Sequence, residues 1–76
     1  MNAARRKQLA EAVALIERAE DILREVSEAE QEAFDAMPES LQQGDRGERM
    51  QEVCNEADDL LGEFEDLAAR VADLAG

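Results

Sequence analysis

The sequence of 76 residues contains no histidine, tryptophan or tyrosine, and its only cysteine is Cys54. Without histidine the usual catalytic triads and a Cys/His zinc site cannot be assembled. A lone cysteine cannot form an intrachain disulfide, so a reducing cytoplasm is the expected compartment. We therefore expect a protein that is not an enzyme, with no catalytic residues, no metal site and no cofactor.

Long hydrophobic runs and positive charge are also scarce. No apolar run approaches the roughly 20 residues of a transmembrane helix, and the N-terminal residues lack the apolar core of a signal peptide. We expect a soluble protein with no membrane partner. Eight basic residues against twenty acidic ones leave a net charge of -12. Direct nucleic acid binding is not expected, because few side chains can neutralise phosphates.

Apolar residues recur at helical spacing on both sides of a central break. In the first half Leu9, Ile16 and Leu23 lie seven residues apart, and Asn2 is a suitable N-cap. The second half fits a heptad that starts with Met50 at position a and has apolar residues at positions a, d and e. The sequence thus predicts a single domain, residues 1–76, with helices over about 3–36 and 47–75.

A connector over residues 37–46 separates the two predicted helices. Pro38 disfavours helical geometry at the residue before it, and Gly44 is expected to close the turn in a left-handed conformation. Asp45 is expected to cap the second helix together with Glu48, three residues later. Leu41 is expected to fold back onto the tip of the molecule. These signals predict an ordered cap.

Two long helices joined by about ten residues predict an all-α fold, an antiparallel two-helix hairpin. Each apolar stripe is wider than one neighbouring helix covers, so the hairpin is expected to form a homodimer with four helices in a bundle. Arg5, Arg6 and Lys7 are expected to pair with the acidic end of the second helix. The residues expected at the oligomer interface are Leu9, Ile16, Leu23, Val53, Leu60, Leu61, Phe64, Leu67, Val71 and Leu74.

The remaining face of the second helix is acidic. It can be a solvated helix surface, or it can bind the basic groove of a nucleic-acid-binding protein as a DNA mimic and compete with the normal ligand. Acid pairs such as Glu17 with Glu20 could also hold Mg²⁺, as in all-α nucleotide pyrophosphohydrolases, but such pairs arise without function among twenty acids. The acids that carry this face are Glu52, Glu56, Asp59, Glu63 and Asp66.

The stretch QEAFDAMPESLQQGDRGERMQE, followed by EADDLLGEFEDL, resembles a family of small acidic helical proteins from phage and prophage gene sets. The MPESLQ turn and the RGERM restart carry the resemblance, because helical periodicity alone does not require those residues. The resemblance implies a mobile-element origin and a protein that binds host machinery, such as an anti-CRISPR inhibitor of bacterial defence. It also marks Glu39, Arg46 and Arg49 as a recognition patch, although these residues can equally serve only as a cap.

Two functions follow from these patterns. The main hypothesis is a non-enzymatic acidic protein-binding module that engages a protein partner with a basic surface. The alternative is a structural module whose activity is homo-oligomerisation, with no inhibitory role.

Overall fold

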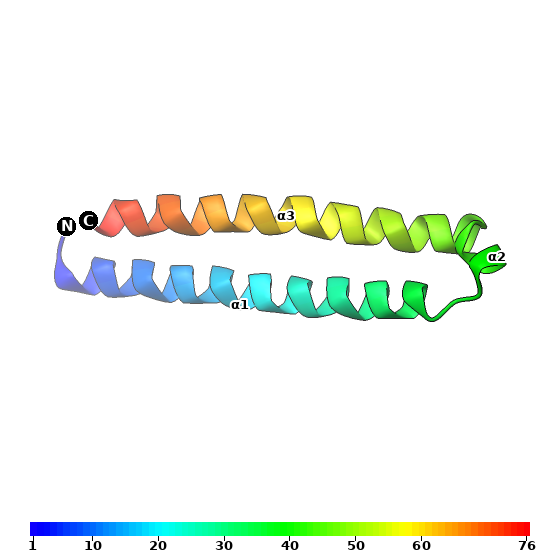
Figure 1. The fold of residues 1–76 in the computed structure, drawn as a ribbon. Coiled ribbons are helices and arrows are strands. Elements are labelled where there is room, and N and C mark those ends of the chain that lie inside the picture. Colours follow the sequence, from blue (N-terminus) through cyan, green and yellow to red (C-terminus); the bar gives the residue numbers. More distant parts are fainter.

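The computed structural model describes all 76 residues and contains three helices, α1 (Ala3–Asp35), α2 (Glu39–Gln42) and α3 (Asp45–Ala75). Figure 1 shows α1 and α3 side by side, with both chain ends at one end of the molecule and α2 at the other. The Cα atoms occupy a rod of 59 × 14 × 12 Å. The all-helical prediction is confirmed. Neither long helix contains a stretch apolar enough to cross a membrane.

Asn2 determines where α1 begins. Its backbone is extended, and its side-chain oxygen accepts a hydrogen bond from the Arg5 backbone N–H at 2.9 Å. This bond satisfies one of the amide groups that have no partner in the first turn of a helix. At the other end, α1 stops at Asp35, one residue before the expected limit. The helix does not continue further because Pro38, shortly after, cannot extend it.

The connector differs from the sequence prediction at Gly44 and Asp45. Gly44 has φ -86° and ψ 179°, and no residue of the chain has a positive φ, so the predicted left-handed turn is wrong. Gly44 is itself the N-cap of α3, which therefore begins at Asp45 with no side-chain cap. The reason is that α2 adds a helical turn inside the connector, and the Gly44 N–H donates to the Leu41 carbonyl at 3.1 Å. One extended residue then suffices to start α3.

The tip depends on a close approach between α2 and α3 at Gly47. A Cβ atom on Gly47 would lie 2.6 Å from the carbonyl carbon of Gln42 and 2.7 Å from its Cα. Gln42 also donates from Nε2 to the Phe34 carbonyl at 2.9 Å, which ties α2 to the end of α1. Leu41 was expected to cover the tip, but its side chain is 55% exposed. In the single turn of α2 the polar Gln42 side chain, and not Leu41, faces the rest of the molecule.

The most buried part of the molecule is the half of α3 nearest the tip. Met50, Cys54 and Ala57 form this small core beside Gly47, whereas no residue of α1 is fully buried. The Cys54 thiol lies 3.7 Å from the Ser27 carbonyl oxygen as a weak hydrogen-bond donor. This contact fixes the register of the two long helices, with Cys54 at the level of Ser27.

Candidate partner-binding surface

The apolar heptad positions of α3 divide between a covered side and an open side. Positions a and e include the buried residues Met50, Cys54 and Ala57, which face α1. Position d turns away from α1: Val53 and Leu60 are half-buried, and Leu67 and Leu74 are exposed. Because Leu74 is 63% exposed, one neighbouring helix clearly does not cover this stripe.

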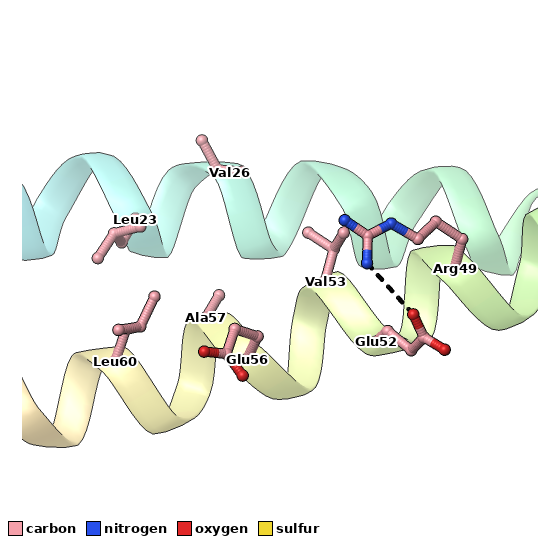
Figure 2. A pocket seen from close by; sticks show the side chains of 8 residues that line it. All are labelled: Leu23, Val26, Arg49, Glu52, Val53, Glu56, Ala57 and Leu60. Carbon is pink, nitrogen blue, oxygen red and sulfur yellow. Dashed lines mark hydrogen bonds and ion pairs between the residues drawn. The ribbon is translucent and has the colours of Figure 1, made fainter.

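A matching row of apolar residues on α1 is exposed on the same side of the molecule. Val26 lines a shallow groove together with Leu23 of α1 and with Val53 and Leu60 of α3 (Figure 2). Ile22 lies four residues before Val26, so it shares this side of the helix, and helical spacing also places Leu15 there. Leu15 is 72% exposed. We use the name open apolar face for the exposed and half-buried apolar residues on this side, namely Leu15, Ile22, Val26, Val53, Leu60, Leu67 and Leu74.

The residues expected at an oligomer interface fall into two groups in the structure. Four of them belong to the open apolar face. The others are half-buried, namely Leu9, Ile16, Leu23, Leu61, Phe64 and Val71. The sequence-based set lacked Leu15, Ile22 and Val26. The seven-residue spacing of Leu15 and Ile22, one residue before Ile16 and Leu23, was the available signal.

We call the set Glu52, Glu56, Asp59, Glu63 and Asp66 of α3 the acidic row. This row borders the open apolar face. Glu52 and Glu56 line the groove in Figure 2, and Glu63 lines a neighbouring hollow with Leu60 and Leu67. All five acids of the row are exposed. From Glu52 to Asp66 the row extends about 21 Å at the rise of an α-helix. A partner that covers the apolar face therefore also meets carboxylates at its edge.

Most of the acidic row has no basic partner within the chain. Arg49 pairs with Glu52 at 3.2 Å, and Arg70 approaches Asp66 at 4.0 Å. The third ion pair of the molecule, between Asp21 and Arg24 of α1, is also local to one helix. Glu56, Asp59 and Glu63 therefore present uncompensated charge to solvent.

The proposed recognition residues of the tip are exposed but are not gathered into one site. Glu39 belongs to α2, and Arg46 lies in the first turn of α3, where it makes no ion pair. Arg49 is joined to the acidic row through its contact with Glu52 (Figure 2). Of the three tip residues, the structure thus connects only Arg49 with the acidic row.

The basic residues near the N-terminus do not pair with the acidic side chains of α3 as expected. Arg5, Arg6 and Lys7 form no ion pair, so the predicted pairing with α3 of the same chain is wrong. Residues 67–75 of α3 carry Asp73 as their only acidic side chain, and it is exposed. Acidic partners are therefore few at this end of the rod, and the three bases remain available for contacts outside the chain.

The acid pairs considered for Mg²⁺ do not form a larger cluster. No group of three or more carboxylate or thiol side chains lies close enough to hold a metal ion. No protein-family model, curated protein or solved structure matches this chain. The open apolar face and its acidic edge are the surface features on which a functional proposal can be based.

Proposed function

We propose that the chain is a non-enzymatic protein-binding module, an antiparallel helical hairpin whose carboxylates bind a basic surface of another protein. The observation that carries this proposal is the exposed acidic row of α3, in which Glu56, Asp59 and Glu63 have no basic partner. Uncompensated carboxylates on a chain with a net charge of -12 attract lysine and arginine side chains over long range.

The partner that best fits this surface is a host protein whose basic groove normally holds nucleic acid. A straight row of carboxylates about 21 Å long can occupy such a groove and exclude the phosphates of the normal ligand. The resemblance to phage and prophage proteins supports a host target and an inhibitory role of the anti-CRISPR kind. Exposed Arg46 and Glu39 offer additional contacts at the tip.

A charge-reversal experiment tests this function. The double variant Asp59→Lys and Asp66→Lys changes two acids that line none of the apolar hollows. We expect it to lose at least about tenfold in capture of basic proteins from host lysate, quantified by mass spectrometry, because each lost charge contact contributes to affinity. The circular dichroism spectrum of the variant should remain that of a helical protein.

The matched control places the same charge change on α1. Glu17→Lys with Glu28→Lys reverses two exposed acids of that helix and gives the same net charge. Retained capture by this control, with loss in the α3 variant, supports the acidic row as the binding surface. Equal capture by both variants would show that the row is only a solvated helix surface.

A second function, homo-oligomerisation, is favoured by the open apolar face. The single chain exposes 5636 Å², whereas a compact monomer of this mass exposes about 4,600 Å². Two hairpins that join their open faces in a four-helix bundle bury the exposed leucine, isoleucine and valine side chains. In this alternative the chain is a structural module with no inhibitory role, and it assembles without capturing a host protein.

A further inference from the structure

We infer that a second copy of this chain covers the open apolar face with both tips at the same end of the dimer. In this arrangement α1 of each copy lies against α3 of the other. The inference rests on the homodimer proposed above and specifies its surface and its orientation. It is drawn from the order of charged residues along the two edges of the open apolar face.

The register of the two helices determines which charges lie at the same level. The contact between Cys54 and Ser27 fixes this register near the tip. At the opposite end Leu9 lines a hollow with Ala72, which agrees with the same register. Both helices rise about 1.5 Å per residue, so each step back along α1 corresponds to one step forward along α3.

Charged residues flank the open apolar face at seven-residue intervals on each helix. On α1 Glu11, Arg18 and Glu25 lie three or four residues from Leu15 or Ile22, and Glu32 continues their seven-residue spacing. On α3 each of them lies three or four residues from a position d residue, so these charges border the face. All are exposed. The edge of α1 consists of Glu11, Arg18, Glu25 and Glu32, and the edge of α3 consists of Arg70, Glu63, Glu56 and Arg49.

With the tips together, the α1 edge of one copy faces the α3 edge of the other at equal levels. Glu11 then lies at the level of Arg70, Arg18 at the level of Glu63, and Glu32 at the level of Arg49. Three of the four levels thus pair opposite charges, and two-fold symmetry repeats each pair. The exception is Glu25, which meets Glu56.

With the tips at opposite ends, each helix would instead meet its own copy. A two-fold axis near Leu60 brings Val53 of one α3 to the level of Leu67 of the other. Arg49 then meets the second copy's residue 70, also an arginine, and Glu56 meets the second copy's residue 63, also a glutamate. Both of these α3 levels pair like charges, which is destabilising at close range. On α1 the same axis brings Glu11 to the second copy's residue 32, also a glutamate, and only Arg18 meets an opposite charge, the second copy's residue 25. One level of four is thus favourable in this register, against three of four with the tips together, so the charge order favours the arrangement with the tips together.

The like-charged level, where Glu25 of one copy meets Glu56 of the other, provides a direct test. Glu25→Lys converts the only like-charged level into a favourable pair, twice per dimer. We expect the dissociation constant of the dimer, measured by analytical ultracentrifugation, to fall at least about threefold, since exposed ion pairs each contribute modestly.

The control is Glu17→Lys, which has the same change in net charge. Glu17 is exposed and lies two residues from Leu15, so it turns to roughly the opposite side of α1. Equal dissociation constants for the two variants would overturn the charge pairing.

A distance measurement tests the orientation independently. A spin label on Gln43→Cys occupies the exposed tip, while the native Cys54 thiol is buried. With the tips together, electron paramagnetic resonance should record about 20–30 Å between the two labels, since neighbouring helix axes lie 8–10 Å apart. A distance near the 59 Å length of the rod in an intact dimer overturns the orientation alone. A monomer without a dipolar signal overturns the homodimer itself and this inference with it.

Discussion

At the scale of single residues, Gly47 shows how a missing side chain positions the tip. The backbone of Gln42 occupies the space that a Cβ on Gly47 would need. We expect Gly47→Ala to lower the free energy of unfolding by about 1–3 kcal/mol, because the neighbour is backbone and must move as a unit. Urea denaturation followed by circular dichroism measures this change.

Gly44 provides the control for the Gly47 substitution. Its φ of -86° suits any residue, and a Cβ there would lie 3.5 Å from the Leu41 carbonyl oxygen, an ordinary contact. Gly44→Ala should therefore have a much smaller effect, limited to the weaker capping ability of alanine. Equal losses at Gly44 and Gly47 would contradict the importance of the close approach between α2 and α3.

At the scale of the element, α3 is an unbroken helix of 31 residues with a glycine near its middle. Nothing lies within 4 Å of the position that a Cβ on Gly62 would occupy. We expect Gly62→Ala to raise the free energy of unfolding by about 1 kcal/mol, because alanine has less backbone freedom to lose and a higher helix propensity. The same urea titration tests this expectation. Unchanged or reduced stability would indicate that a partner approaches α3 closely at Gly62.

The same helix explains why the molecule has one open face. Three of every seven positions of α3 are apolar, but α1 meets only the side formed by positions a and e. Position d is therefore left for another surface, and its exposure increases from half-buried Val53 to exposed Leu74. Such a wide apolar stripe is typical of helices with two neighbours.

At the scale of the whole molecule, a rod of two helices buries little. Only four of 76 residues are buried, and all of them lie in one half of α3. We expect sedimentation equilibrium to give twice the chain mass of 8.4 kDa at micromolar concentration. The melting temperature should fall on dilution, because unfolding is then coupled to dissociation. A mass of one chain with a melting temperature independent of concentration would contradict the homodimer.

Much of the fold could be predicted because its signals are local in the sequence. Asn2 begins α1 through a bond to a residue three positions away, and α1 ends one residue before the predicted limit. The seven-residue repeat of apolar residues predicted both long helices, and the helical spacing of the acids predicted the acidic row. Turn chemistry was less reliable: the predicted ordered connector contains the short helix α2, but the glycine that matters at the tip is Gly47 and not Gly44.

The sequence by itself therefore determined the two helices, their apolar stripes and their charge, since these depend on residues at most a few positions apart. Only the tertiary structure decided which part of each stripe stays open, why Gly47 must lack a side chain, and that Arg5, Arg6 and Lys7 find no partner in their own chain. The physical reason is that these features depend on the register and rotation of α1 against α3. That geometry brings together residues far apart in the sequence, such as Ser27 and Cys54.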